Sequence, residues 1–222
     1  MTPGMEAALK AHEAGNYREA ARLYTVELAA EEAKPAPSWV QLSYLHNQLG
    51  LALHNAGLYD KALEHYQKSL AIKLKKLGPE HPDVATSYNN IGGVHRLKGE
   101  YDKALEHFQK ALAIDLKQLG PEHPDVATSY ISIGAVHEKK GEYDKALEHH
   151  QKALAIRLKK LGPEHPSVAI SYHNMAYVYK AKKDLAKAKE YWEKAHTIRL
   201  KKLGLNHPNT KDTKANLDEL KE

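Results

Sequence analysis

A 42-residue period runs through the chain and constrains its fold more than any other property of the sequence. The string LGPEHPDVATSY begins at Leu77 and again at Leu119, LGPEHPSVAISY begins at Leu161, and a shorter version, LGLNHPNT, begins at Leu203. A second marker with the same spacing is a glycine followed by Tyr two residues on and by Ala five residues on; its glycines are Gly15, Gly57, Gly99 and Gly141. Two markers that share one period indicate a repeat protein, whose units bury their apolar faces against their neighbours.

Apolar residues between these markers recur at three- and four-residue steps, which is the spacing of one face of an α-helix. In residues 82–97 they are Val84, Tyr88, Ile91 and Val94, and in residues 101–116 they are Ala104, Leu105, Phe108, Ala111, Leu112 and Leu116. Each repeat is therefore predicted to be a pair of antiparallel helices, and the fold class to be all-α.

The boundaries of the predicted helices carry signals of their own. Residues 38–41, Ser-Trp-Val-Gln, are typical of a capping box. Gly99 and its equivalents permit a tight turn within each hairpin, whereas Lys183-Asp184-Leu185 replaces Gly-Glu-Tyr in the last unit, which allows a turn of different shape there. Prolines suit first helical turns, where a missing N–H costs nothing; those with the 42-residue spacing are Pro82, Pro124, Pro166 and Pro208.

The composition excludes several classes of protein. There is no cysteine, which rules out disulfides, thiolate metal sites and cysteine nucleophiles. Residues 1–15 mix charged and polar residues with no apolar core, and no stretch reaches the roughly 18 apolar residues that a membrane span requires. We therefore expect a soluble cytoplasmic protein with no membrane partner.

The repeats resemble the tetratricopeptide repeat (TPR) family, in the 42-residue version found in kinesin light chains and related proteins. The resemblance rests on LGPEHPDVA at the start of the first helix, on NNIGGVH at residues 89–95, and on GEYDKALEHFQKALAI at residues 99–114. It implies an α-solenoid, a right-handed superhelix of antiparallel helical hairpins. The concave face of such an array is lined mainly by the first helix of each hairpin and binds extended peptides.

We expect one array to span residues 1–222. Its C-terminal segment is polar, with only Leu217 and Leu220 recurring, as a solvent-facing terminal element must be. The parts are a partial or N-capping repeat at 1–34, full repeats at 35–76, 77–118, 119–160 and 161–202, and a C-terminal capping helix at 206–222.

Differences between neighbouring repeats point to a ligand site. Residues 77–118 and 119–160 are identical at 34 of 42 positions, and five of the eight differences fall in the first helix. We call the positions that lie 42 residues apart in successive repeats a column. Columns in the core should keep the same residue, whereas columns that face a ligand are free to differ. By resemblance to the family, the groove columns hold Asn47, Gln48, Asn89, Asn90, Gly93, Ser132, Ala135, His173, Asn174 and Tyr177, and the groove edge holds Arg96 and Lys180.

Asparagine suits peptide binding, because its amide both donates and accepts hydrogen bonds and can pair with an extended backbone of any sequence. Gly93 and Ala135 leave room beside it. Arg96 and Lys180 are able to meet acidic side chains of a partner, in keeping with a formal net charge of +5. The alternative is that these residues are ordinary solvated helix surface. A clamp for a chaperone's C-terminal carboxylate is not expected, because the matching positions lack Lys and Arg.

Fifteen histidines raise the question of a metal site. Most recur at the 42-residue spacing, which places them roughly 10 Å apart on neighbouring hairpins, too far for a metal that binds His at about 2.0–2.1 Å. No metal, cofactor or catalytic residue is predicted, since no P-loop, GxGxxG, GxSxG or HExxH motif is present. The loop histidines are expected to cap helices or to pack on a neighbouring loop; they are His81, His123, His165 and His207.

The sequence thus favours a scaffold or adaptor, not an enzyme, that binds a peptide of a protein partner, including a peptide with acidic residues. The alternative is a structural role, as a self-assembling or consensus-like engineered array without a natural ligand, motivated by the near identity of two units. The chain is expected to be a monomer or to self-associate weakly. Nucleic acid is not an expected partner, because base-reading residues would have to recur in every unit.

Overall fold

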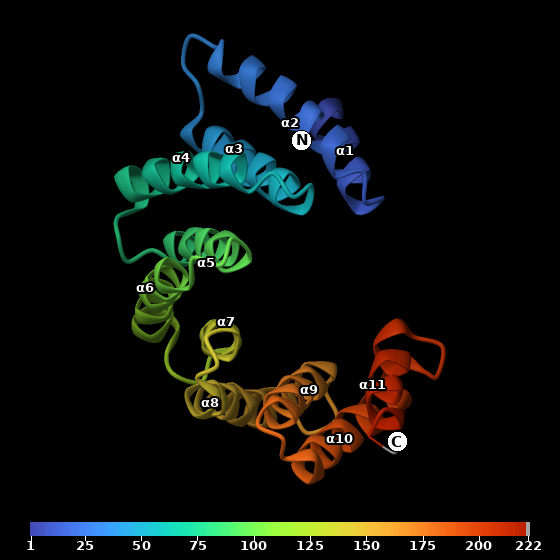
Figure 1. The fold of residues 1–222 in the computed structure, drawn as a ribbon. Coiled ribbons are helices and arrows are strands. Elements are labelled where there is room, and N and C mark those ends of the chain that lie inside the picture. The colour runs from blue at the N-terminus through green and yellow to red at the C-terminus, as the bar shows by residue number, and fades with distance from the viewer. Residues whose placement is uncertain (221–222) are drawn as a thin grey trace. The chain divides into compact units, whose positions relative to one another are not determined.

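The computed structural model describes residues 1–220, and these residues form helices and no strand. The predicted all-α class is therefore confirmed. Figure 1 labels the helices, which are α1 (Pro3–Glu13), α2 (Tyr17–Glu32), α3 (Trp39–Asn55), α4 (Tyr59–Leu77), α5 (Pro82–Leu97), α6 (Tyr101–Leu119), α7 (Pro124–Lys139), α8 (Tyr143–Leu161), α9 (Pro166–Ala181), α10 (Leu185–Leu203) and α11 (Pro208–Asp218). The last part of the predicted cap, residues 221–222, lies outside the described residues.

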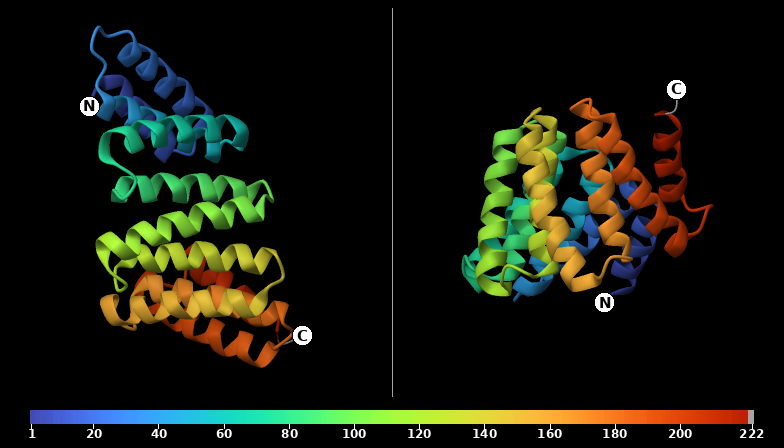
Figure 2. Two further views of the ribbon diagram at one scale, coloured as in Figure 1. Left: turned by 90° about the vertical axis from the view of Figure 1, so that its left-hand side faces the viewer. Right: turned by 90° about the horizontal axis from the view of Figure 1, so that it is seen from below.

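The chain divides into two compact units, residues 1–114 and residues 115–222, with the division inside α6. Within the first unit, α1 packs on α2 and α3 on α4; within the second, α7 packs on α8 and α9 on α10. The paired helices run antiparallel, side by side (Figure 2). Each pair is a hairpin with a first helix and a second helix, so the first helices are α1, α3, α5, α7 and α9.

Histidine residues cap the helices that begin at Pro82, Pro124, Pro166 and Pro208. His81 Nδ1 accepts a hydrogen bond of 3.1 Å from the backbone N–H of Asp83, which is one of the donors left unsatisfied at a helix start. The imidazole accepts at Nδ1, so the proton of the neutral ring is on Nε2. The predicted capping role of the loop histidines is thus confirmed, because His123, His165 and His207 accept in the same way.

The predicted capping box at Ser38 is only half present. Ser38 Oγ accepts from the backbone N–H of Gln41, at 3.5 Å, as expected. The backbone N–H of Ser38, however, donates to Glu31 Oε1 at 2.8 Å, and Glu31 is buried at the end of α2. The N–H of Ser38 therefore donates to a carboxylate of the preceding helix and not to the side chain of Gln41, because Glu31 offers it a stronger, charged acceptor.

The turn between α9 and α10 has the same shape as its counterparts, despite its different sequence. Lys183 adopts φ +63°, close to the +76° of Gly99 and the +75° of Gly141. The backbone N–H of Asp184 donates to the Tyr179 carbonyl at 3.0 Å, as Glu100 does to His95 at 2.9 Å. Closing this hydrogen bond requires the left-handed conformation, which Lys183 adopts at a cost that glycine avoids.

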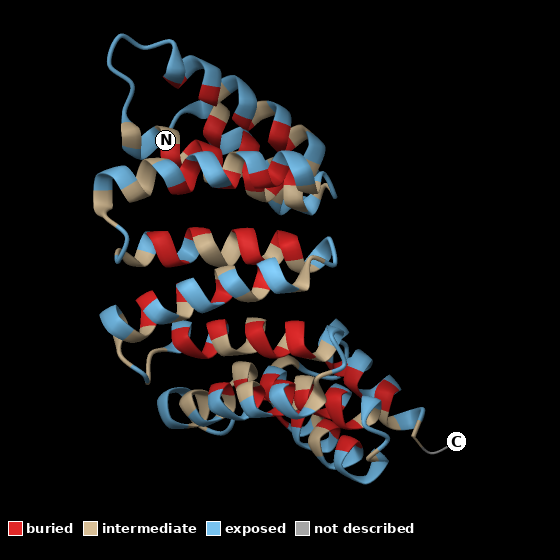
Figure 3. Cartoon of the chain, turned by 60° about the vertical axis from the view of Figure 1, so that its left-hand side comes forward, coloured by how far each residue is buried: buried red, intermediate tan, exposed pale blue. Residues whose placement is uncertain are grey.

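Within each unit, the core lies between the two helices of a hairpin and between a hairpin and the helix that follows it. The buried residues form red stripes along the helices in Figure 3. Small residues allow this close packing. A Cβ atom added at Gly92 would come within 2.9 Å of the Phe108 ring, and one added at Gly50 within 2.8 Å of the Tyr66 ring. In these two hairpins the first helix therefore lies directly against an aromatic ring of the second helix.

Candidate functional site

The predicted groove residues lie on first helices in both units. The first unit contains Asn47, Gln48, Asn89, Asn90, Gly93 and Arg96, on α3 and α5. The second unit contains Ser132 and Ala135 on α7, and His173, Asn174, Tyr177 and Lys180 on α9. All are half-buried except His173, which is 9% exposed, and Tyr177, which is 36% exposed.

In the first unit, the amide side chains link α3 to α5. Asn90 Nδ2 donates to Asn47 Oδ1 at 3.0 Å, so two of the predicted residues from neighbouring first helices are in direct contact. Beside them, a Cβ atom built on Gly93 would meet only His54 Cε1, at 3.9 Å, so the helix backbone is open there. Burial, and next to it the charge of Arg96, lowers the pKa of His54, which leaves Arg96 as the cation of this edge.

A pocket next to Asn47 was not predicted from the sequence. Its volume is about 410 Å³. Lys73 reaches it from α4, with Nζ 3.1 Å from Ser87 Oγ, and burial lowers the pKa of Lys73. The sequence held one signal for this pocket, since Trp39 is one of only two tryptophans. The lining residues are Trp39, Val40, Ser43, Tyr44, Asn47, Lys73, Leu77, His81 and Asp83.

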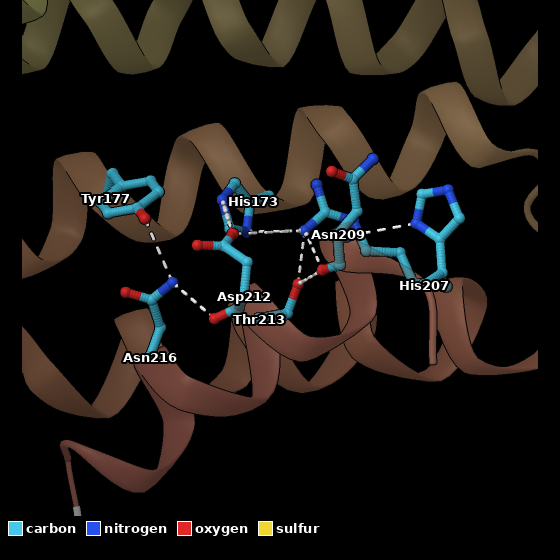
Figure 4. A network of polar contacts seen from close by, with 8 residues as sticks. His173, Tyr177, His207, Asn209, Asp212, Thr213 and Asn216 are labelled. Atoms are coloured by element: carbon cyan, nitrogen blue, oxygen red, sulfur yellow. Dashed lines mark hydrogen bonds and ion pairs between the residues drawn. The ribbon is translucent and has the colours of Figure 1, made fainter. Parts of the chain in front are cut away.

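In the second unit, His173 bridges two helices that follow it. Arg199 Nη1 of α10 lies 3.2 Å from His173 Nδ1, and Asp212 Oδ2 of α11 lies 3.2 Å from His173 Nε2 (Figure 4). Arginine can only donate, so His173 accepts at Nδ1 and carries its proton on Nε2, which donates to Asp212. Burial, followed by the charge of Arg199, lowers the pKa of His173 to about 4, so the ring is neutral near pH 7.

Two further predicted residues contact the same C-terminal helix. Asn216 Nδ2 donates to the Tyr177 hydroxyl at 3.1 Å, and Lys180 Nζ lies 2.8 Å from Glu219 Oε2. Lys180 Nζ also lies 5.6 Å from the centre of the Trp192 ring, a cation–π distance. His173, Tyr177 and Lys180 thus hold α11 in this structure, a contact that the sequence did not reveal.

Arg199 belongs to a column of charged residues near the ends of the second helices. This column was not predicted from the sequence. Arg157 Nη1 donates to Ser171 Oγ at 3.1 Å and to the Ser167 carbonyl at 2.8 Å. Arg199 donates to Thr213 and, at 3.0 Å, to the Asn209 carbonyl. The signal was a charged residue every 42 positions on an otherwise apolar helix face: Lys73, Asp115, Arg157 and Arg199.

The histidines of residues 1–220 do not gather into a metal centre. Within this part of the chain, no three or more His, Asp or Glu side chains are placed to hold one metal ion. The nearest pair is His46 and His65, whose Nδ1 atoms are 3.0 Å apart, and burial lowers the pKa of His46 to about 4. Over the same residues, no helix combines the length and apolar character needed to cross a membrane.

Comparison with known families shows to which repeat family the chain belongs. The tetratricopeptide repeat model matches three times, at residues 41–117, 83–159 and 125–201, and so covers most of the chain. The chain belongs to the tetratricopeptide repeat family. TPR arrays generally mediate protein–protein interaction and are typically non-enzymatic. No protein among those with curated functions matches the sequence.

Solved TPR structures have the same fold. BtubC (BKLC) from P. vanneervenii is 26% identical, with a TM-score of 0.76, and the alignment covers 90% of this chain and 80% of that one. A putative kinesin light chain from Podospora anserina with nearly identical TPR-like repeats is 28% identical, with a TM-score of 0.74 and coverage of 89% and 94%. MamA, at 23% identity, a TM-score of 0.60 and coverage of 91% and 98%, shares the fold. The predicted likeness to kinesin light chain repeats is confirmed.

Proposed function

We propose that this TPR chain is a scaffold whose first helices hold an extended peptide segment of a partner protein. The observation that carries the proposal is the pair of amides on α3 and α5, where Asn90 Nδ2 lies 3.0 Å from Asn47 Oδ1 next to the open backbone at Gly93. An amide can exchange such a contact for hydrogen bonds to a peptide N–H or C=O without loss of pairing. This supports recognition of a main chain instead of one particular side chain.

The pocket beside Asn47 supports a peptide that carries an apolar side chain. Trp39 and Tyr44 line it with aromatic surface, and Lys73 and Asp83 supply polar groups. Pockets with mainly apolar walls and a few placed polar groups are typical of ligand sites. Arg96, at the other end of the predicted columns, favours an acidic residue further along the same peptide.

A peptide-array screen of the full chain tests the proposal. The selected peptide is then remade with single N-methylated amide bonds, which remove one backbone donor at a time. If the asparagines read the main chain, N-methylation at the positions that face them weakens binding by tenfold or more, whereas alanine substitution of side chains at those positions has little effect. A peptide whose affinity depends on its side chains alone would contradict main-chain recognition.

Self-assembly is the second candidate function. The near identity of residues 77–118 and 119–160, at 34 of 42 positions, favours it, because similar units offer similar surfaces to a second copy. Sedimentation velocity over a hundredfold range of concentration separates the two functions. A constant monomer that still binds the selected peptide excludes self-assembly as the main role.

A further inference from the structure

The C-terminal helix α11 follows the last hairpin at the place of a further first helix, and it is more polar than the first helices α7 and α9. The position of Thr210 holds a fully buried valine in the three preceding repeats, namely Val84, Val126 and Val168, and a partly buried leucine, Leu42, in repeat 35–76. Thr210 itself is fully buried, and its hydroxyl has no hydrogen-bond partner. Among the described residues of this segment, Leu217 and Leu220 are the partly buried apolar residues that pack against the core. Because burial of apolar surface is the main source of helix packing energy, we expect α11 to be held more weakly than α7 and α9, which bury mainly apolar residues.

Three polar side chains make specific contacts instead, two of them on α11 and the third, Glu219, directly after its last residue. Asp212, Asn216 and Glu219 are spaced four and three residues apart, so they form one stripe along the helix. Figure 4 shows two residues of this stripe against α9, where Asp212 contacts His173 and Asn216 donates to the hydroxyl of Tyr177. The contact of Glu219 with Lys180 extends the stripe by one turn.

We define the receiving surface as the capping patch, which consists of His173, Tyr177, Lys180 and Arg199. Ring contacts inside the second unit hold the aromatic part of this patch. Tyr177 packs edge-on against Trp192, with ring centres 5.3 Å apart, and against His173 at 4.8 Å. Trp192 is fully buried below them. The second unit's own rings thus position His173 and Tyr177, whereas Arg199 takes most of its polar contacts from α11.

The two cations of the capping patch find their acidic partners on α11. Among the described residues, the ion pairs of Lys180 and of Arg199 are with Glu219, at 2.8 Å, and with Asp212, at 3.9 Å. Removal of this segment would leave a guanidinium and an ammonium without the two carboxylates that pair with them here. Charge complementarity of this kind fits an acidic segment and opposes a basic one.

We propose that the capping patch is a binding site for an acidic helix of a partner protein, and that α11 occupies this site until the partner displaces it. The partner helix presents two carboxylates and an amide or hydroxyl group at the spacing of Asp212, Asn216 and Glu219. This inference rests on the proposed function as a peptide-binding scaffold, and it adds a second site, in residues 115–222, for a helical ligand. The weak apolar packing of α11 permits the exchange, while its attachment to the chain gives it a high effective concentration that keeps the patch closed without a partner.

A peptide that copies residues 205–220, labelled with fluorescein, is the probe. Fluorescence anisotropy compares its affinity for the full wild-type chain with that for the full chain carrying Asp212→Lys and Glu219→Lys, whose α11 is repelled by the patch. We expect the double variant to bind the peptide at least tenfold more tightly than the wild type. The matched control, Lys211→Glu with Lys214→Glu, changes two exposed residues of the same helix and should behave as the wild type.

Two further measurements make the result specific. Adding Lys180→Glu to the double variant should reduce peptide affinity by tenfold or more, as should replacing both carboxylates of the peptide by Asn and Gln. Hydrogen exchange of the wild-type chain with excess peptide should show loss of amide protection in α11 alone, and this readout needs no variant to fold.

Equal affinities of the wild-type and double-variant chains, or unchanged protection of α11 at saturating peptide, would overturn the inference. So would a concentration-dependent wild-type dimer that takes up no peptide, because α11 would then exchange only between copies. The proposed function is judged separately, by capture of an array-selected peptide through Asn89 and Asn90 in residues 1–114. Persistent capture there, without binding of the α11 peptide, overturns this inference and leaves the scaffold function intact.

Discussion

The imidazole of His150 lies directly against the backbone of Gly134, so closely that a Cβ atom added to Gly134 would come within 2.8 Å of His150 Cε1. His150 is fully buried, and neither ring nitrogen has a hydrogen-bond partner. In the preceding repeat the same place holds Phe108 against Gly92. The second unit therefore buries a polar ring where the fold needs only an apolar one.

We predict that His150→Phe stabilises the chain by about 1–3 kcal/mol, because it removes two buried groups that have lost their hydrogen bonds to water. The phenyl ring fits, since Phe108 occupies the equivalent space. Urea unfolding followed by circular dichroism measures the change as a shift of the midpoint. The reciprocal variant, Phe108→His, is the control and should lose a similar amount; a neutral or destabilising His150→Phe would contradict this account of the core.

Acid should destabilise the protein through its buried histidines. Burial lowers the pKa of His150 to about 4, as it does for His46 and His173. A folded pKa below the unfolded value of about 6.5 means that the neutral ring stabilises the fold fully above pH 6.5, and that this stability is lost as the pH falls toward 4. For His150 alone the loss is at most about 1.4 kcal/mol per pH unit. Unfolding at pH 7.0, 5.5 and 4.5 should show a smaller loss of stability with falling pH for His150→Phe than for the wild type. An equal loss in the two proteins would contradict the role of His150 in acid destabilisation.

Lys183→Gly should stabilise the chain by about 0.5–1 kcal/mol, because Lys183 holds φ +63°, a conformation that glycine adopts freely. Thermal unfolding measures the gain as a higher melting temperature. Gly141→Lys places lysine in the matching turn at φ +75° and should lower the melting temperature to a similar extent. An unchanged melting temperature for Lys183→Gly would mean that the turn bears no strain.

Asp115 is the exception in the charged column and offers a fourth prediction. It accepts from Ser129 Oγ at 3.1 Å, it is 4% exposed, and burial raises its pKa. At the equivalent place Arg157 donates to both a serine and a helix-start carbonyl. Asp115→Arg should therefore stabilise the chain by about 1 kcal/mol, since it restores these donors and places a cation near Asp125. Urea unfolding measures the change. A lower unfolding midpoint for Asp115→Arg would show that arginine does not fit at this position.

The fold could be predicted from the sequence because its signals are local and repeated. The His-Pro step at His81 and Pro82 marks a helix start with a proline at the first turn and a capping side chain. The turn at Lys183 was harder, since its shape follows from a backbone hydrogen bond to Tyr179 and not from the residue at the turn. The partner of Ser38 was also out of reach, because Glu31 belongs to the preceding helix and meets it only after packing.

The candidate site could be predicted in part. Divergent columns located residues such as Asn90 and His173 on the first helices, but a column does not reveal what contacts it. Asn90 contacts Asn47 between the first helices α5 and α3, and His173 contacts Asp212 between α9 and the C-terminal helix α11. Each contact therefore depends on how a helix packs on the hairpin beside it. Arg199 was missed because a charged residue near a helix end also suits the helix dipole, an equally simple explanation.

The most direct test of peptide binding by the first helices is the dissociation constant of the array-selected peptide for Asn89→Ala with Asn90→Ala in the full chain. The matched control is Gln67→Ala with Gln109→Ala, which removes two exposed amides from the second helices α4 and α6. Isothermal titration should show binding at least tenfold weaker for the asparagine variant and unchanged for the control, with melting temperatures within a few degrees of the wild type. An unchanged dissociation constant for the asparagine variant would contradict the proposed site.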